Sequence, residues 1–456
     1  MLDGLEQAVR GRVVRRGAAD YDAARRAAVW NGRKPARQPD AIVQVADAAD
    51  VQAAVAYATA HDLRIALRNG GHNWSGLSLR DGGLLLDLQA LNGLAIDAPR
   101  RVATVGPAVR GLALAEALAP HGLAFPVGHC SSVALGGFLL GGGFGWNAGA
   151  WGVGCFNVRA VDVVLADGRL VRADAEHEPD LFWAARGAGA GFFGVVTRFE
   201  LDLHPLPTVI RSSLLSFPLA QLDALVGWVR SLVPALPPWV ELTLMIGRPP
   251  GVVSARHEPV CSVSVAVFAD TPQQAAAALA PLADCPIAPR LACVLDVPSS
   301  FAALFAGMDE LYVAGRRYQV DTLWSDADPA AVLATVGAHV AASPGADNLV
   351  LALLLPPPPA AAPPLPDAAF SMVAPLYLGC YAVWDDAVHD AAHLAWSRDL
   401  MRALEPHGVG HYLGEADLTA AQRAERSFGA AQWQRLQALR RRYDPQRRLH
   451  GFPGAE

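Results

Sequence analysis

Short runs of apolar and β-branched residues, each bounded by glycine or polar positions, recur along the N-terminal part of the chain. They lie at 41–45, 63–68, 83–88, 101–105, 159–164 and 195–203, and their composition favours β-strands. Between them, 50–61 and 112–121 have apolar residues at helical spacing. Asp47, ahead of the first of these segments, is a typical helix N-cap. The pattern predicts an α+β domain over residues 1–205.

The pattern changes after residue 206, where prolines become more frequent. Strands are predicted at 240–246, 260–268 and 372–383, with helices around 271–282 and 387–404 between or after them. This order predicts a second domain over residues 206–409, an antiparallel sheet covered by helices. A last helix is predicted at 427–443, ended by Asp444-Pro445. We expect the segment 410–456 to close back onto the first domain.

Composition excludes several classes of protein. With 456 residues, 52% of them hydrophobic, the chain can bury a large core, and its net charge of −6 provides no basic field for nucleic acid. Residues 1–14 lack the apolar core of a signal peptide, and no apolar run is long enough to span a membrane. We therefore predict a soluble, cytoplasmic protein without a nucleic-acid or membrane partner. The six cysteines show no C-x-x-C spacing, so neither a metal site nor a disulfide framework is predicted.

Two reactive side chains lie in glycine-rich loops. His72 is within Arg68-Asn69-Gly70-Gly71-His72-Asn73-Trp74-Ser75-Gly76, and Cys130 precedes a run rich in glycine that extends to Gly145. Either residue alone is more often a polar surface histidine or a small buried cysteine. Glycines at this density, however, allow backbone N–H groups to approach a pyrophosphate, and imidazole and thiolate are both nucleophiles. The pair together suggests two covalent anchors for one flavin.

Other cofactor and catalytic motifs do not fit. Residues 189–194 match G-x-G-x-x-G, but a helix is predicted before them and a strand after them, the reverse of a dinucleotide-binding unit. There is no G-x-S-x-G and no G-x-x-x-x-G-K sequence. A hydrolase using Cys130 with His129 is conceivable, although adjacent residues rarely point at each other.

The chain resembles the berberine-bridge-enzyme-like FAD-linked oxidases of the vanillyl-alcohol-oxidase, or PCMH-type, flavoprotein superfamily. The resemblance extends over most of the chain and ends in Tyr412, Glu415-Ala416-Asp417 and Arg442-Tyr443-Asp444-Pro445. Its other parts are Trp30-Asn31 and residues 39–55, 68–76, 82–88, 136–146, 162–168, 181–187 and 193–197.

This resemblance implies an N-terminal PCMH-type FAD domain completed by the C-terminal segment, with the middle domain covering the isoalloxazine ring. His72 matches the residue bonded to the flavin 8α-methyl group and Cys130 the one bonded to C6, so bicovalent FAD is expected. The implied cofactor-binding residues are His72, Cys130, Arg68, Asn69, Gly70, Gly71, Asn73, Trp74, Ser75, Gly76, Val133, Gly136, Gly137, Gly142, Gly143, Phe144, Asn147, Gly194, Val195 and Val196.

The resemblance also implies an FAD-dependent oxidase acting on CH–OH or CH–NH donors. The expected reaction is oxidation of an alcohol (a sugar, an aromatic alcohol or a secondary metabolite) by hydride transfer to flavin N5, with O2 as acceptor and H2O2 as product. Val133 matches a position that gates oxygen. Tyr412 is the expected base, because a tyrosine can take the hydroxyl proton if its pKa is lowered; Gly414 stands where relatives often have asparagine. Tyr318 and Tyr381 are expected to assist, and Tyr377, also on a candidate strand of the middle domain, could do so as well. A dehydrogenase with another acceptor and a flavin-loaded binding protein remain alternatives.

Two further polar groups belong to the middle domain. Arg316 or Arg317 could bind an anionic substrate, although a surface position is the simpler interpretation.

Overall fold

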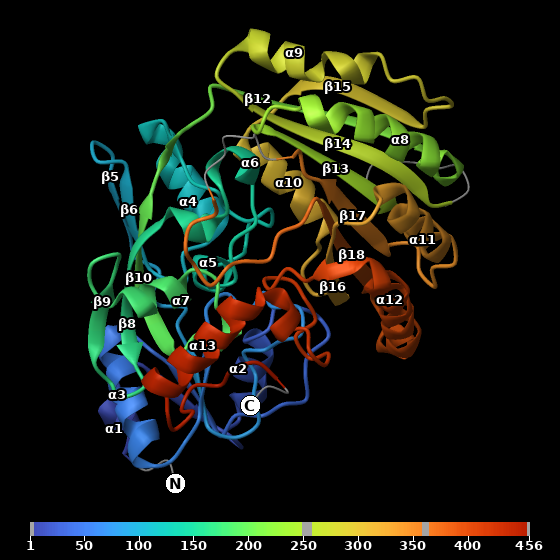
Figure 1. Cartoon of the computed structure of the whole chain (residues 1–456). Coiled ribbons are helices and arrows are strands. Elements are labelled where there is room, and N and C mark those ends of the chain that lie inside the picture. The colour runs from blue at the N-terminus through green and yellow to red at the C-terminus, as the bar shows by residue number, and fades with distance from the viewer. Residues whose placement is uncertain (1–3, 249–257, 358–363, 454–456) are drawn as a thin grey trace.

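The computed structural model describes residues 4–248, 258–357 and 364–453. Two sheets form the N-terminal part of the molecule (Figure 1). The first has the strand order β1-β2-β4-β3 and the second β5-β6-β10-β8-β9. Their strands are β1 (Arg12–Arg15), β2 (Ala41–Gln44), β3 (Ile65–Arg68), β4 (Leu84–Asp87), β5 (Leu94–Asp97), β6 (Val102–Val105), β8 (Val158–Leu165), β9 (Leu170–Ala173) and β10 (Gly194–Asp202).

The first sheet explains the apolar runs at the start of the chain. β4 pairs in parallel with both β2 and β3, and all four of its residues are buried. A strand enclosed in this way needs an uninterrupted apolar sequence. Helix α3 (Ala48–Ala60) packs on this sheet, and the predicted cap is confirmed because the Asp47 side chain accepts hydrogen bonds from the N–H groups of Ala49 and Asp50.

Shorter helices connect and cover these sheets. The helix predicted at 112–121 is α4, which ends at Leu118 and continues as a 3-10 turn. As predicted, a helix precedes the 189–194 glycines and a strand, β10, follows them. The helices are α1 (Leu5–Ala8), α2 (Tyr21–Ala27), α4 (Gly111–Leu118), α5 (Leu135–Leu140), α6 (Ala148–Trp151) and α7 (Pro179–Ala185), and the short strands β7 (Leu123–Ala124) and β11 (His204–Pro205) pair with each other.

The predicted antiparallel sheet is confirmed, and it is larger than the sequence indicated. Its order is β15-β12-β14-β13-β17-β18-β16-β19, and all neighbours are antiparallel. The strand predicted from residue 372 starts at Leu376, directly after Pro375. The strands are β12 (Val209–Pro218), β13 (Val240–Gly247), β14 (Val260–Ala269), β15 (Ala292–Pro298), β16 (Arg317–Ser325), β17 (Leu349–Leu354), β18 (Leu376–Trp384) and β19 (Gly408–Gly410).

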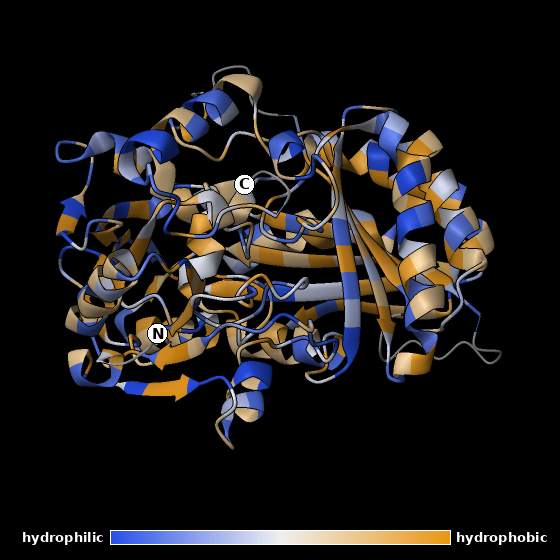
Figure 2. Cartoon of the chain, turned by 90° about the horizontal axis from the view of Figure 1, so that it is seen from below, coloured by the Kyte–Doolittle hydropathy of each residue, from blue (hydrophilic) through white to orange (hydrophobic). Residues whose placement is uncertain are grey.

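Helices cover one face of this large sheet (Figure 1). Alternate strand residues, such as Leu242 and Leu244 on β13 and Leu378 on β18, pack with these helices in one apolar core. Figure 2 shows the interior strands largely as hydrophobic, whereas the outer helices carry both hydrophobic and hydrophilic residues. The helices of this region are α8 (Leu222–Leu232), α9 (Pro272–Ala283), α11 (Pro329–Ala341) and α12 (Asp390–Leu404), while α10 (Phe301–Leu311) contacts α4 instead.

The C-terminal segment returns to the N-terminal sheets. Helix α13 (Ala430–Tyr443) buries Leu436 and Leu439 in the same core as the second sheet. Beyond it, the N–H of His450 donates to the carbonyl of Ile65 at 2.9 Å. Both ends of the chain therefore pack on one body, and the large sheet projects from it (Figure 1). None of the helices in the described residues is long and apolar enough to cross a membrane.

Candidate active site

A cavity of about 380 Å³ lies between the N-terminal loops and the face of the large sheet that the helices leave uncovered. Because side chains alternate along a strand, the residues between the core positions of β13, β17 and β18 point to this side. The volume is within the range of small-molecule sites. The sheet contributes Glu241, Thr243, Met245, Leu351, Leu353, Tyr377 and Tyr381 to the wall.

His72 enters the cavity from the loop after β3. Its ring stacks on Trp30, with 4.7 Å between centroids, and its Nε2 lies 2.9 Å from Ser132 Oγ. Burial, reinforced by the charges of Arg110 and Arg68, lowers the pKa of His72 to about 4. The imidazole is therefore neutral at neutral pH and keeps a nucleophilic lone pair.

Cys130 reaches the same cavity from a different loop. The bond between His72 and Ser132 ties the two loops together, since Ser132 is only two residues beyond this cysteine. Burial raises the pKa of the Cys130 thiol, and the carboxylates of Glu415 and Asp309 raise it further. Cys130 is thus a protonated thiol that must lose its proton before it reacts as a nucleophile.

Residues from the C-terminal part of the chain, among them Tyr377, Tyr381, Tyr412 and Glu415, complete the wall. Tyr377 and Tyr381 both donate hydrogen bonds to Oε2 of Glu415, at 2.7 and 3.0 Å. Tyr412 instead accepts a hydrogen bond, from the N–H of Phe144 at 2.9 Å. A Cβ on Gly414 would lie 2.6 Å from the Tyr412 hydroxyl oxygen, so a side chain at position 414 would collide with the tyrosine ring as it lies here.

Comparison with known proteins decides the family. The FAD binding domain family matches residues 39–174. Over 434 residues the chain is 31% identical to the FAD-linked oxidoreductase ptmO of Penicillium ochrochloron, which covers 95% of this chain and 94% of that protein. The chain belongs to the FAD-linked oxidoreductases.

One further relative and one solved structure are also similar to the chain. The chain is 34% identical to (R)-6-hydroxynicotine oxidase of Paenarthrobacter nicotinovorans over 228 residues, 50% of this chain and 49% of that protein. The solved structure of BBE-like 1 from Physcomitrella patens superimposes with a TM-score of 0.84 at 20% identity, covering 100% and 98% of the two chains. The fold of this FAD-linked oxidoreductase is accordingly of the PCMH type.

The cavity wall fits FAD. Two buried atoms of cavity-lining residues, Asn69 Oδ1 and Arg68 Nε, have no hydrogen-bond partner among the described residues, and such atoms normally pair with a protein group, a water or a ligand. Gly137 also lines the cavity, and a Cβ added to it would meet no atom of the chain within 4 Å. The rest of the Arg68 guanidinium is fixed, because Nη1 donates to both carboxylate oxygens of Asp87 at 3.0 and 2.9 Å.

The structure brings most of the predicted cofactor residues of this FAD-linked oxidoreductase to the cavity, but not all. Those in the wall are Arg68, Asn69, Gly70, Gly71, His72, Asn73, Trp74, Cys130, Val133, Gly137, Phe144 and Gly194. Those that do not line it are Ser75, Gly76, Gly136, Gly142, Gly143, Asn147, Val195 and Val196. Gly136 acts indirectly, since a Cβ there would lie 2.7 Å from the side chain of Asn69.

Of the three predicted catalytic tyrosines, Tyr412 and Tyr381 line the cavity and Tyr318 does not. The Tyr318 ring is fully buried behind Trp74, and its hydroxyl donates to the carbonyl of Val313 at 2.8 Å. We therefore leave it out of the proposed machinery. Arg316 and Arg317 are also outside the wall, where they pair with aspartates.

The sequence predicted no role for Glu415, although Glu415-Ala416-Asp417 is one of the C-terminal segments that carry the family resemblance. Tyr377 and Tyr381, four positions apart on one strand, were a usable signal that two phenols share a face. The partner of those phenols could not be identified, because Glu415 lies on a loop well beyond the strand.

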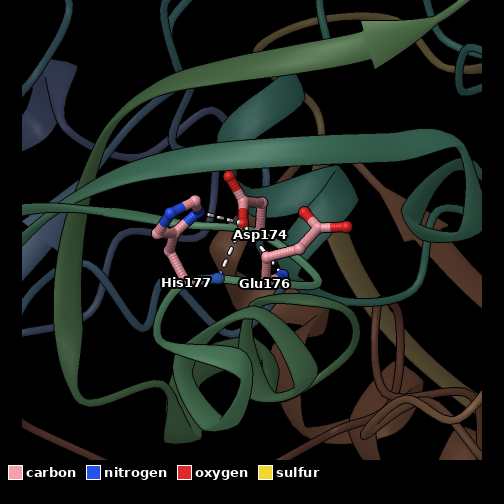
Figure 3. A group of neighbouring side chains, drawn as sticks. All are labelled: Asp174, Glu176 and His177. Carbon is pink, nitrogen blue, oxygen red and sulfur yellow. Dashed lines mark hydrogen bonds and ion pairs between the residues drawn. The ribbon is translucent and has the colours of Figure 1, made fainter.

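One group of metal-compatible side chains lies on the surface, away from the cavity. Asp174, Glu176 and His177 are close enough to share an ion (Figure 3). Asp174 accepts hydrogen bonds from the N–H groups of Glu176 and His177 and lies 2.9 Å from His177 Nδ1. These bonds explain the cluster as a turn stabilised by one carboxylate.

The ion pair of His129 and Glu241, 2.8 Å apart, predicts a pH-dependent stability. Burial lowers the pKa of His129, but the charge and hydrogen bond of Glu241 outweigh it, and the pKa is raised. The stabilisation is then fully present below about pH 6.5, the pKa of an unfolded histidine, and is lost as the pH rises through the folded pKa. We expect Glu241→Gln to lower the free energy of unfolding by about 1.5–3 kcal/mol near pH 6 and by less near pH 9, in urea titrations.

The exposed Glu310 offers the matched control for this prediction. Glu310→Gln removes the same charge and should change stability little at either pH. An equal loss at both pH values in Glu241→Gln would show that the His129 charge does not contribute.

Proposed function

We propose that this FAD-linked oxidoreductase holds FAD through two covalent bonds, at His72 and Cys130, and oxidises an alcohol with O2 as electron acceptor. One observation carries the first part. Two nucleophiles from separate glycine-rich loops open on one cavity, and the loops are joined by the hydrogen bond between His72 and Ser132. The oxidation of a small molecule is in keeping with a cavity of this size and with the small molecule named for (R)-6-hydroxynicotine oxidase.

The residues that line the cavity are proposed to exclude water and to control the access of oxygen to the cofactor. FAD, when bound, would supply the acceptor for the hydride and pass the electrons to O2. Part of the cavity wall is apolar and excludes water from the reacting groups; it includes Trp74, Phe144 and Leu353. Val133 lines the cavity three residues after Cys130, in keeping with its proposed control of oxygen access.

Tyr412 is the proposed acceptor of the hydroxyl proton. Burial raises its pKa, while the hydrogen bond from the Phe144 N–H lowers it by stabilising the phenolate. Tyr377 and Tyr381 both donate to Glu415, and burial and the Glu415 charge keep the pKa of both phenols well above the ordinary value. The pKa of Tyr412 is raised as well, so the preference for Tyr412 rests on the hydrogen bond that its oxygen accepts.

The test is an intact-mass spectrum of the purified yellow protein together with an absorbance-monitored substrate screen, in air and without air. We expect an adduct of FAD size, bleaching by a substrate without air, and rapid return of the yellow colour with H2O2 formation in air. Flavin that separates on denaturation would refute the attachment. Reduced protein that stays reduced for minutes in air would indicate a dehydrogenase, and flavin that no substrate bleaches would indicate a binding protein.

A further inference from the structure

The two carboxylate oxygens of Glu415 differ in their hydrogen bonds within the described residues. Oε2 accepts from both tyrosines, whereas Oε1 makes no hydrogen bond with any residue that the structure describes. The side chain is half-buried and lines the cavity. With both phenol donors on Oε2, Oε1 is left for a group that occupies the cavity.

The other charged groups of the wall are already paired. Arg68 is bound to Asp87, and Glu241 is bound to His129. Arg80 donates to the carbonyl of Gly451, on the C-terminal segment. No lysine or arginine within residues 4–248, 258–357 and 364–453 forms an ion pair with Glu415.

Burial is the main cause of the raised pKa values of Cys130, Tyr312 and Tyr412, and the charge of Glu415 raises all three further. All three residues line the cavity together with Glu415. A carboxylate that no lysine or arginine of the described residues neutralises attracts a cation and disfavours an anion.

Aromatic rings surround the same carboxylate. Tyr381 lies 5.2 Å from Tyr312 and 6.0 Å from Trp74 between ring centroids, and Phe144 lies 5.7 Å from Tyr377. The faces of such rings attract cations, most strongly where water is excluded. An apolar ligand would remove water from Glu415 without replacing its hydrogen bonds, and an alcohol would return one hydrogen bond but no opposite charge, so both are less favourable than a cation.

We propose that Glu415, positioned by Tyr377 and Tyr381, is an anionic subsite that binds a protonated nitrogen of the substrate. The substrate class is thereby a small, largely apolar amine or amino alcohol. This proposal rests on the proposed function in one respect, that the cavity is where the substrate binds. It requires no particular identity of the bond that is oxidised.

The experiment compares three ligands of one shape on the purified, flavin-loaded protein at pH 7 without air: 2-phenylethylamine, 2-phenylethanol and phenylacetate. Isothermal titration calorimetry gives the Kd of each without requiring turnover. We expect the ammonium compound to bind at least about tenfold more tightly than the alcohol, and the anion to bind most weakly, as for a charge pair that is partly desolvated. Equal affinity for amine and alcohol, or no amine binding at about 1 mM, would overturn the proposal.

Glu415→Gln removes the charge and keeps an oxygen that can accept from the two tyrosines. It should weaken amine binding about tenfold or more and change alcohol binding less than about twofold. Glu310→Gln is the matched control, because it removes the same charge on α10, whose inner face lines the cavity, while Glu310 itself is exposed. If Glu415→Gln retains the preference for the amine, Glu415 is not the subsite. If that variant does not fold, the comparison of the three ligands on the unaltered protein still decides.

This outcome is separable from that of the proposed function. Protein that selects the amine through Glu415 but stays reduced in air would refute the oxidase and leave the subsite standing. Rapid oxidation of neutral alcohols in air, with no preference for the amine, would support the oxidase and refute the subsite.

Discussion

Replacing both His72 and Cys130 with alanine is expected to abolish the covalent FAD adduct completely, whereas either single replacement should leave one adduct of FAD size. The reason is that the two side chains come from separate loops that open on one cavity, so each bond can form without the other. Intact-mass spectra of the three variants, and the yellow colour of acid-precipitated protein, measure this directly. The variant His72→Ala should also show the slower attachment, because Cys130 has a raised pKa and His72 a lowered one.

Two replacements serve as controls for these variants. Cys155 is a buried free thiol and His204 a half-buried histidine bonded to Asn157, and neither lines the cavity. Cys155→Ala and His204→Ala should keep the full adduct. Loss of the whole adduct in His72→Ala, with no change in Cys130→Ala, would mean a single attachment through histidine.

Tyr412→Phe is expected to lower kcat by about 10²- to 10⁴-fold, the usual contribution of a positioned acid or base. Because burial raises the pKa of Tyr412, only a small fraction of the phenol is ionised at neutral pH. Activity of the unaltered enzyme should therefore increase with pH as that fraction grows, and the variant should lose this increase. Oxygen consumption with a substrate found by the absorbance screen, recorded between about pH 6 and pH 10, provides both quantities.

Tyr318→Phe is the matched comparison. Its hydroxyl bonds to the Val313 carbonyl outside the cavity, so its loss should cost about 1 kcal/mol of stability and leave kcat and its pH profile unchanged. A large fall in kcat for Tyr318→Phe, or an unchanged pH profile for Tyr412→Phe, would assign the proton transfer to a different group.

The two halves of the cavity have different structural origins, and this bears on specificity. The His72 loop follows β3, of which three of four residues are buried, and the Cys130 loop lies between β7 and α5. The opposite wall is one face of the large sheet, where every second residue of a strand can change without disturbing the helix-covered core. Substitutions at Thr243, Met245 or Leu351 can therefore alter which substrate fits while the attachment site stays intact.

The local pattern of the sequence was sufficient for the elements and for the two anchors. Apolar runs marked β2, β4 and β10, and Asp47 marked the start of α3. His72 and Cys130 stood out because glycines surround them in the chain itself. Strand β12 was not located, because its polar and apolar positions do not alternate clearly and tertiary packing decided its conformation.

The polar side of the site was decided by the tertiary structure alone. Tyr377, Tyr381 and Glu415 meet only because β18 presents its odd-numbered residues to the cavity and the loop after β19 passes over that face. Tyr318 sits on the neighbouring strand β16, yet its hydroxyl is directed to Val313, which its position in the sequence does not reveal. The sequence determined which side chains could do chemistry, since residue type and local glycine content are properties of the chain. Which of them share one space follows from strand register and the packing of distant segments, and these are fixed only when the whole core forms.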